Sequence, residues 1–258
     1  MMENILFTQE DHLAYVTISR PDVRNALNKE TLIELKQTLE KLEEMDEVKC
    51  VIITGEGEKS FAAGADISQL EKKTMYDAFK SGSMQEIYDY IEGYTKPTIA
   101  MVNGYALGGG CELAMACDIR VAATHAKFGL PELNLSIIPG AGGTQRLTRL
   151  VGRGKALEMI LTGKLISSEE AAAIGLITEM AEITHLKEKT VEIAQQIISK
   201  GPMAVMMAKL AVNMGADTDM KTGLLIEKLS QAILFASEDK NEGTRAFLEK
   251  RKPVFQGK

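Results

Sequence analysis

The sequence predicts an α/β protein with a helical C-terminal part, on the basis of three observations. Short apolar segments typical of buried strands alternate with helical patterns through about residue 180. Beyond that point only helical patterns follow. The chain has 258 residues, 45% of them hydrophobic, so it can bury a sizeable core. We therefore expect a core over residues 1–200 and a C-terminal helical region over residues 201–258.

The first part of the chain predicts a hairpin, a capped helix and a buried strand. Residues 4–8 and 13–19 form two strand-like runs joined by a polar turn, and the second run alternates in side-chain type. Leucines recur at helical spacing over residues 31–45, and Asn28 is placed to cap that helix. Residues 48–54 form the next apolar run. The Gly-rich segment after it lacks the spacing of a phosphate-binding loop.

The stretch from Pro97 to Asp118 combines a predicted buried strand, three consecutive glycines and a predicted helix. Residues 98–102 are short, apolar and bounded by a proline and a turn, so they predict a buried strand. Three glycines, Gly108 to Gly110, then open a predicted helix, and their backbone can approach a ligand closely because it lacks Cβ atoms. The first N–H groups of a helix have no partners within it and bind anions. The glycines therefore indicate either tight strand-to-helix packing or an anion-binding backbone.

Two isolated carboxylates follow these glycines. Glu112 lies one turn inside the predicted helix, among apolar residues and with no cation near it in the sequence. It either points to solvent, where the helix dipole favours it, or lies in an apolar pocket that raises its pKa and suits it to proton transfer. Glu132 follows Pro131, whose ring restricts the approach of the chain.

The remaining elements are mostly helical. Asp66 is placed to cap a helix that begins at Ile67, and a longer helix is predicted over residues 74–94. Residues 140–144 lack the third glycine of a dinucleotide-binding fingerprint, so NAD binding is not expected. Strands are predicted at residues 119–122 and 176–180. The other predicted helices cover residues 144–151, 154–161, 168–174, 184–200, 202–214, 219–236 and 239–249.

Charge and composition argue against several classes of protein. The net charge is −6 and the 30 basic residues are dispersed, so neither nucleic acid nor a membrane surface is an expected partner. No apolar run approaches the roughly 18 residues of a spanning helix, and the N-terminus lacks the order of a signal peptide. A cytoplasmic location is therefore expected.

Neither the cysteines nor the histidines have the spacing of a metal site. The cysteines lie in apolar surroundings without metal-ligand spacing, which predicts reduced thiols in the core. The histidines lie singly in polar segments, which predicts exposed side chains without a catalytic partner. These residues are Cys50, Cys111, Cys117, His12, His125 and His185. We therefore expect no metal site.

Four motifs resemble the crotonase, or enoyl-CoA hydratase, family in order and spacing. They are FAAGADI at residues 61–67, NGYALGGGCELAMACDIR at 103–120, FGLPEL at 128–133 and PGAGGTQRL at 139–147. The resemblance covers essentially the whole chain and is closest to the bacterial, clostridial-type short-chain enoyl-CoA hydratases of butyrate and butanol metabolism. It implies a spiral of ββα units with C-terminal helices that assemble homotrimers or, as dimers of trimers, homohexamers.

The resemblance also implies a catalytic site. The backbone N–H groups of Ala65 and Gly109 would form an oxyanion hole for the thioester carbonyl of an acyl-CoA. Glu112 would be the base for the water that attacks C3, and Glu132 the proton donor to C2. Their presence favours hydration, in which crotonyl-CoA becomes 3-hydroxybutyryl-CoA. Coenzyme A is then part of the substrate, and no other cofactor is expected.

The same resemblance places the coenzyme A part of the substrate against two segments. One is the loop over residues 24–27, and the other is the segment over residues 63–68. For Arg24 the alternative is a solvated side chain with no part in binding. The implied substrate-binding residues are Arg24, Ala26, Ala63, Ala65, Asp66, Ile67, Ser68 and Gly109. Many hydratases of the family have Gln where Leu130 stands and Lys where Ser68 stands, so the family's nucleotide contacts and the polarity around its site are not carried over to these two positions.

Two other functions stay open at this point. One is double-bond isomerisation of an enoyl-CoA, which needs a carboxylate and the oxyanion hole but no bound water. The other is a non-catalytic relative that binds acyl-CoA or RNA.

The resemblance also implies that the predicted helix over residues 74–94 forms one wall of the acyl pocket, which its bulky side chains would close to long chains. These side chains are Met75, Tyr76, Phe79, Met84 and Ile87.

Overall fold

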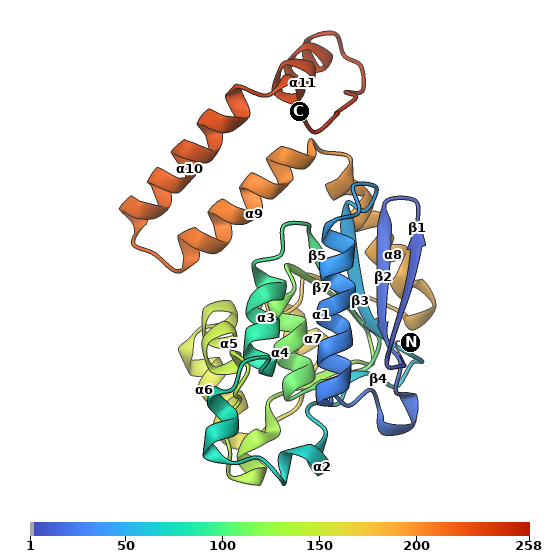
Figure 1. Ribbon diagram of the computed structural model, residues 1–258, viewed down its shortest axis with the longest axis vertical. Helices are drawn as coiled ribbons and strands as arrows, with labels where there is room; N and C mark the ends of the chain where they lie inside the picture. The colour runs from blue at the N-terminus through green and yellow to red at the C-terminus, as the bar shows by residue number, and fades with distance from the viewer. Residues whose placement is uncertain (1–2) are drawn as a thin grey trace.

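The computed structural model describes residues 3–258 and contains two sheets wrapped by helices (Figure 1). The strands are β1 (Ile5–Glu10), β2 (Leu13–Ile18), β3 (Cys50–Gly55), β4 (Ser60–Ala62), β5 (Thr98–Val102), β6 (Tyr105–Leu107), β7 (Ile119–Ala123), β8 (Lys127–Gly129), β9 (Ile166–Ser167) and β10 (Glu179–Ala181). The larger sheet has the order β1-β2-β3-β5-β7-β10 and the smaller one β4-β6-β8-β9. Among the strand pairs of the described residues, only β1–β2 and β8–β9 are antiparallel.

The helices complete a repeated ββα pattern. They are α1 (Lys29–Glu43), α2 (Ile67–Leu70), α3 (Met84–Glu92), α4 (Gly109–Ala116), α5 (Gly143–Val151), α6 (Arg153–Thr162), α7 (Ser168–Ala173), α8 (Ile183–Ile198), α9 (Pro202–Ala216), α10 (Met220–Phe235) and α11 (Glu238–Leu248), with 3₁₀ helices η1 (Pro21–Val23), η2 (Met75–Phe79) and η3 (Pro131–Leu135). After the first unit, β1-β2-α1, whose strands both belong to the larger sheet, a strand of the larger sheet leads to one of the smaller sheet and then to a helix in β3-β4-α2 and β5-β6-α4. The predicted α/β spiral is confirmed.

The core follows from the apolar patterns of the sequence. Strand β3 is buried along its whole length, as a central parallel strand covered on both faces must be. Helix α1 directs its leucine stripe inward, and the Asn28 side chain caps it by accepting from the Thr31 N–H at 2.8 Å. Asp66 likewise caps α2 by accepting from the Ser68 N–H. The three cysteines are free and buried, as predicted.

One predicted element was wrong, and one sheet was not predicted. The helix expected over residues 74–94 is divided into η2 and α3, because Gly82 has φ +77° and Ser83 starts a new helix by accepting from the Glu86 N–H. The smaller sheet was not predicted. Its strands have only two or three residues, too few for an alternating pattern to be recognised.

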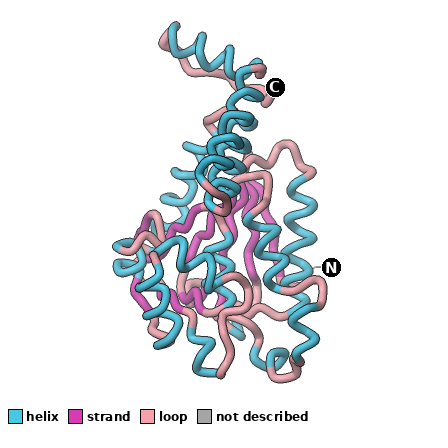
Figure 2. Tube along the Cα trace, turned by 90° about the vertical axis from the view of Figure 1, so that its left-hand side faces the viewer, coloured by secondary structure: helices cyan, strands magenta, loops and turns pink. Residues whose placement is uncertain are grey.

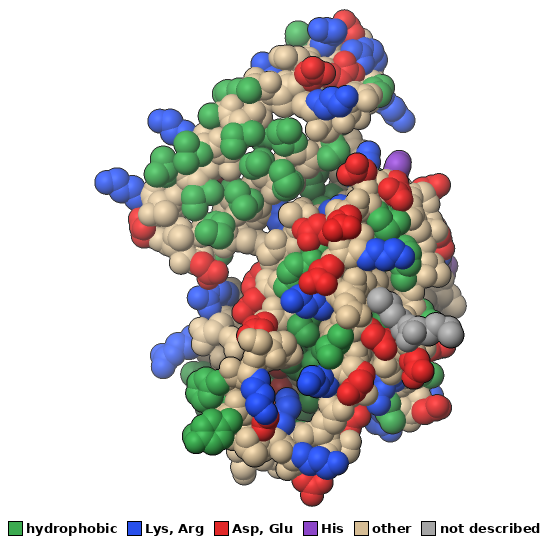
Figure 3. Space-filling model, in the orientation of Figure 1, with side chains coloured by type: hydrophobic (Ala, Val, Ile, Leu, Met, Phe, Trp, Pro, Cys, Tyr) green, Lys and Arg blue, Asp and Glu red, His purple; other side chains and the backbone are tan. Residues whose placement is uncertain are grey.

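The C-terminal helices stand away from the two sheets (Figures 1 and 2). Helices α9 and α10 lie side by side and leave a broad apolar face exposed, visible as the green surface over both helices in Figure 3. The exposed large apolar side chains there are Leu210, Val212, Met214, Met220, Leu224, Leu225, Leu229, Ile233 and Phe235. The boundary expected at residue 200 stays a prediction. No helix in residues 3–258 is both long and apolar enough to cross a bilayer.

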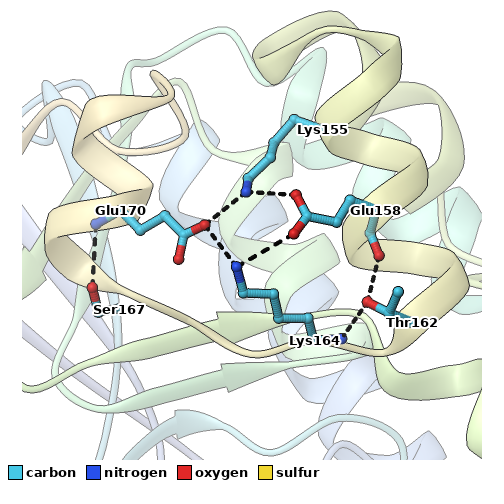
Figure 4. A network of polar contacts seen from close by, with 6 residues as sticks. All are labelled: Lys155, Glu158, Thr162, Lys164, Ser167 and Glu170. Carbon is cyan, nitrogen blue, oxygen red and sulfur yellow. Dashed lines mark hydrogen bonds and ion pairs between the residues drawn. The ribbon is translucent and has the colours of Figure 1, made fainter.

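An ion-pair network joins α6 to α7 and to the loop that contains Lys164 (Figure 4). The Lys155 Nζ lies 2.7 Å from both Glu158 Oε2 and Glu170 Oε1, and the Lys164 Nζ bridges the same two carboxylates. Helix α6 also packs against η3, which carries Glu132. The network therefore ties α7 to α6, the helix that packs against η3 and so supports the position of Glu132.

Candidate active site

Glu112 is buried, with 2% of its surface exposed, on the first turn of α4. Its Oε1 accepts hydrogen bonds from the backbone N–H groups of Ala141 and Gly143, both at 2.8 Å. These amides lie at the N-terminus of α5, where the helix dipole also favours an anion. Of the two interpretations left open by the sequence, the buried pocket is correct, and the partners of the carboxylate come from a distant segment.

The environment of Glu112 balances two opposed effects. Burial raises the pKa of this carboxyl, while the hydrogen bonds from Gly143 and Ala141 and the positive charge of Arg146 lower it. The close approach depends on glycine at position 143. A Cβ atom there would lie 2.8 Å from Glu112 Oε1. Burial is the largest of these effects, so the pKa of Glu112 lies above its usual range, and the two N–H groups and Arg146 limit the rise.

Glu132 has a different environment. Both of its carboxylate oxygens are buried, and neither has a hydrogen-bond partner within residues 3–258. Burial, helped by the nearby charge of Glu112, raises the pKa of Glu132 to about 7. Gly108, with φ +51°, leaves room for it, since a Cβ atom there would lie 3.2 Å from Glu132 Oε1. Glu132 is thus suited to carry a proton near neutral pH.

The backbone amides of Ala65 and Gly109 lie close together. A Cβ atom built on Gly109 would lie 3.6 Å from the Ala65 nitrogen, and one built on Gly64 would lie 3.7 Å from the Gly109 nitrogen. Within residues 3–258, neither amide donates to a backbone carbonyl or a side chain. The buried Tyr88 hydroxyl donates to the Gly109 carbonyl at 2.7 Å and fixes this segment. Two unpaired donors at one place suit an oxyanion.

The three predicted glycines have separate roles. A Cβ atom on Gly110 would lie 2.0 Å from the Ala62 carbonyl oxygen, so this glycine serves tight packing of α4 on β4. Gly108 and Gly109 instead leave backbone beside Glu132 and Ala65. Both interpretations of the glycine run therefore apply, each to different residues.

One cavity of about 470 Å³ brings the predicted catalytic groups together. Glu112, Glu132, Ala65 and Gly109 all line it. Its apolar lining comes from Ile67, Leu70, Ala78, Met84, Leu135, Ile137 and Ile138. An adjoining hollow of about 390 Å³ shares Ala65 and Met84 with it and carries four lysines, namely Lys29, Lys72, Lys73 and Lys80. Asp66 and Asp77 also line this hollow, and Lys80 pairs with Asp77, so Lys29, Lys72 and Lys73 would meet the anionic end of an elongated ligand.

The predicted substrate-binding residues divide into three groups. Ala63, Ala65, Ile67 and Gly109 line the cavity, and Asp66 lines the adjoining hollow. Ser68 lines neither space; its hydroxyl donates to Asp66 Oδ1 at 2.7 Å. Ala26 also lines neither space, and its carbonyl accepts a hydrogen bond from Arg20 Nη1 at 2.5 Å.

Arg24 lies apart from the catalytic groups. It borders a separate hollow of about 300 Å³ together with Asp22 and Glu58. The structure therefore does not bring its side chain to the cavity that holds Glu112. Its part in substrate binding stays a prediction.

The expected acyl wall is wrong in most of its residues. Met75, Tyr76 and Phe79 are 69%, 73% and 84% exposed, and Ile87 is buried in the core. Of the five bulky residues only Met84 lines the cavity. Because η2 is a separate short helix, it turns these side chains outward instead of continuing the line of α3.

Sequence reasoning also missed several residues that shape the site. Ala141 and Gly143 belong to a segment interpreted as an incomplete dinucleotide fingerprint and as a family motif, but not as the hydrogen-bond partner of Glu112, although its glycines signal a close backbone approach. Tyr88 and the four lysines gave no signal, because ordinary helix and loop residues of these types are common. The partners of Glu112 are set by tertiary contacts and have no local pattern.

Comparison with known proteins agrees with this geometry. A family model described as enoyl-CoA hydratase/isomerase matches residues 8–258. The chain belongs to this family. It is 46% identical over 257 residues to a crotonyl-CoA hydratase of Syntrophomonas wolfei, covering 99% of both chains. It is 45% identical to a short-chain-enoyl-CoA hydratase of Clostridium acetobutylicum, covering 97% of both chains.

Solved structures of the enoyl-CoA hydratase/isomerase family confirm the fold. The crystal structure of an enoyl-CoA hydratase from Bacillus anthracis superposes with a TM-score of 0.95 at 41% identity, over 99% of this chain and 100% of that one. One from Geobacillus kaustophilus gives 0.95 at 40% identity. The resemblance seen in the four sequence motifs is therefore confirmed over the full chain.

Proposed function

We propose that this member of the enoyl-CoA hydratase/isomerase family is an enoyl-CoA hydratase that adds water reversibly across the 2,3 double bond of a short-chain trans-2-enoyl-CoA. The observation that carries the proposal is one cavity lined by two carboxylates and two unpaired backbone amides. Glu112 accepts two backbone N–H groups, whereas Glu132 has no hydrogen-bond partner within residues 3–258. The names of the Syntrophomonas and Clostridium relatives support crotonyl-CoA as the substrate and 3-hydroxybutyryl-CoA as the product. The location we propose is cytoplasmic.

The oxyanion hole would stabilise the charge that forms during addition. Attack of water at C3 moves electrons onto the thioester carbonyl oxygen, where the N–H groups of Ala65 and Gly109 are free to donate. Each such donor is worth about 3 kcal/mol in comparable sites. Because both donors are backbone groups on packed segments, they need little reorganisation as the charge grows.

The two carboxylates would divide the proton transfers. Glu112, whose ionised form accepts two N–H groups, takes the proton of the attacking water, and the hydroxyl forms its bond to C3. Glu132, whose neutral form is favoured by burial, donates its proton to C2. A proton passed from Glu112 back to Glu132 through solvent then restores both groups. The pair titrates as a coupled unit.

The coenzyme A part of the substrate would extend into the lysine-lined hollow. Its phosphates are anionic, and Lys29, Lys72, Lys73 and Lys80 border that space. Residues 63–67, each of which lines one space or both, would contact the pantetheine. No cofactor besides the coenzyme A of the substrate is required by this chemistry.

The proposed reaction is tested by following the loss of the conjugated enoyl thioester after crotonyl-CoA is mixed with the protein. We expect 3-hydroxybutyryl-CoA as the product, and the reverse reaction from that compound. A shifted double bond without incorporation of water would instead show an isomerase. If neither reaction occurs and RNA binds with a steep salt dependence, the protein is not a hydratase.

The rate should depend on pH through Glu132. This group must be protonated to act as a donor, and its pKa is raised to about 7. We expect kcat/KM for crotonyl-CoA to fall as the pH rises above about 7, about tenfold per unit once Glu132 is mostly ionised. A rate that stays constant up to pH 9 would contradict the assignment. The measurement uses initial rates from pH 5 to 9 at constant ionic strength.

We expect a four-carbon enoyl-CoA to be preferred over a sixteen-carbon one. A methylene that finds apolar space gains about 0.8 kcal/mol, whereas one forced into packed side chains costs roughly 1–3 kcal/mol. Since Met75, Tyr76 and Phe79 do not close the cavity, the support comes from its volume and from the names of the relatives. Values of kcat/KM that rise with chain length from four to sixteen carbons would contradict this.

The exposed apolar face of α9 and α10 supports self-association. A continuous apolar surface of this kind implies a partner, and closed symmetry is the usual outcome for identical chains. We propose a homotrimer or a dimer of trimers. Light scattering at micromolar concentration should give the mass of three or six chains. Leu225→Glu together with Leu229→Glu should shift it toward the monomer, and a stable monomer in the unaltered protein would contradict the proposal.

A further inference from the structure

We propose that Arg146 is a positioning residue for Glu112, because its guanidinium holds the turn whose amides bind the carboxylate. The inference deepens the proposed hydration and rests on it. Arg146 lies on α5, and its side chain is 8% exposed. A cation this deeply buried needs several good partners, and those of Arg146 lead directly to the site.

The guanidinium and the carboxylate bind opposite ends of the same residue. The Nη1 of Arg146 donates to the Ala141 carbonyl at 2.8 Å, and the Ala141 N–H donates to Glu112 Oε1 at 2.8 Å. The turn is wrapped closely around the guanidinium. A Cβ atom on Gly142, which has φ +99°, would lie 2.1 Å from Nη1. Any movement of Arg146 would therefore move the amides that hold Glu112.

The far side of the guanidinium is anchored on α3. Its Nη2 donates to Asp89 Oδ1 at 2.7 Å and to Glu92 Oε2 at 2.8 Å, and these two side chains are 57% and 44% exposed. Tyr88, the residue before Asp89, donates to the Gly109 carbonyl. Two consecutive residues of α3 thus hold both halves of the site, one through Gly109 and the other through Arg146.

Arg146 also contributes charge at Glu112. The titratable or charged groups whose fields act on or beside Glu112 are Arg146 from α5, Tyr88 from α3, Glu132 from η3 and Cys111 from its own helix. Of these four, only Arg146 is a cation, so it favours the ionised base against the effect of burial. Its loss should raise the pKa of Glu112 and move the acid limb of the kcat/KM profile to higher pH.

Two substitutions separate the charge of Arg146 from its geometry. Arg146→Met keeps a long side chain and removes both the charge and the donors, while Arg146→Lys keeps the charge but cannot reach three acceptors. Arg149→Met is the matched control one turn along the same helix, where the side chain is 52% exposed and pairs only with Asp217 among the acidic side chains. Each variant is compared with the unaltered enzyme for kcat, KM, the pH profile, the melting temperature and the dissociation constant of butyryl-CoA.

For Arg146→Met we expect kcat for crotonyl-CoA to fall 10- to 100-fold, with the acid limb about half a unit or more higher and the butyryl-CoA dissociation constant within twofold. Arg146→Lys should lose at least fivefold in kcat but keep the acid limb in place, and Arg149→Met should change neither. An unmoved acid limb in folded Arg146→Met would overturn the inference. If Arg146→Met does not fold, Arg146→Lys decides, and kcat within twofold of the unaltered enzyme would overturn it.

Because the unaltered enzyme is assayed alongside, failure of the inference is distinct from failure of the proposed function. If the unaltered protein does not hydrate crotonyl-CoA, the proposed function fails. If it does and the Arg146 variants keep its kcat and pH profile, only the positioning role fails.

Discussion

Glutamine at position 112 or at position 132 is expected to lower kcat for hydration of crotonyl-CoA by about two to four orders of magnitude, the usual range for general acid–base groups. Glu112→Gln retains one oxygen that can accept from Ala141 and Gly143, so the amide should keep the position of the carboxylate without its basicity. Glu132→Gln removes the only proton that the proposed mechanism gives to C2. Rapid-quench turnover and butyryl-CoA binding are the measurements.

Thermal unfolding separates lost chemistry from lost structure in these variants. The folded-state pKa of Glu132 is raised above that of the unfolded chain, so its ionised form disfavours folding above neutral pH. Glu132→Gln should therefore melt no lower than the unaltered protein at pH 8. Glu188→Gln, an exposed change on α8, is the matched control and should keep full activity. Near-normal turnover at either active-site position would remove that residue from the mechanism.

The sequence predicted the elements whose pattern is local. Residues 98–102 form the predicted strand, and the cap at Asn28 lies where the sequence places it, because short-range hydrogen bonds and apolar runs determine both. The division between η2 and α3 was missed although Gly82 and Ser83 mark it. The apolar residues over 74–94 recur at helical spacing on both sides of Gly82 and Ser83, so the periodicity alone does not show that a new helix starts there.

The chemical groups of the candidate site could be predicted from the sequence, but their hydrogen-bond partners could not. Unusual glycines and isolated carboxylates can be recognised in a sequence, and Glu112, Glu132 and Gly109 do meet in one cavity. That Glu112 has two amide partners and Glu132 has none is decided by tertiary contacts more than twenty residues away. The same limit applies to Arg24, which the family resemblance placed against the coenzyme A part of the substrate and which borders a separate hollow.

The oxyanion hole can be tested by removing one amide without removing the residue. Gly109→Pro deletes the N–H proposed to bind the thioester oxygen, and Gly109→Ala adds a Cβ atom but keeps that N–H. In either variant the new Cβ atom would lie 2.7 Å from the Met84 sulfur, the end of a flexible side chain that can move aside. The two variants therefore share the change at Cβ, and proline in addition replaces the amide hydrogen by its Cδ atom.

We expect Gly109→Pro to have a kcat about 100- to 1,000-fold below that of Gly109→Ala, the usual loss for one oxyanion donor. Proline is tolerated at the first position of a helix, where Gly109 lies, so α4 should still form. Circular dichroism and melting temperature check this for both variants. Equal kcat values in the two folded variants would show that the Gly109 amide does not bind the oxyanion, since the loss would then follow the Cβ atom and not the N–H.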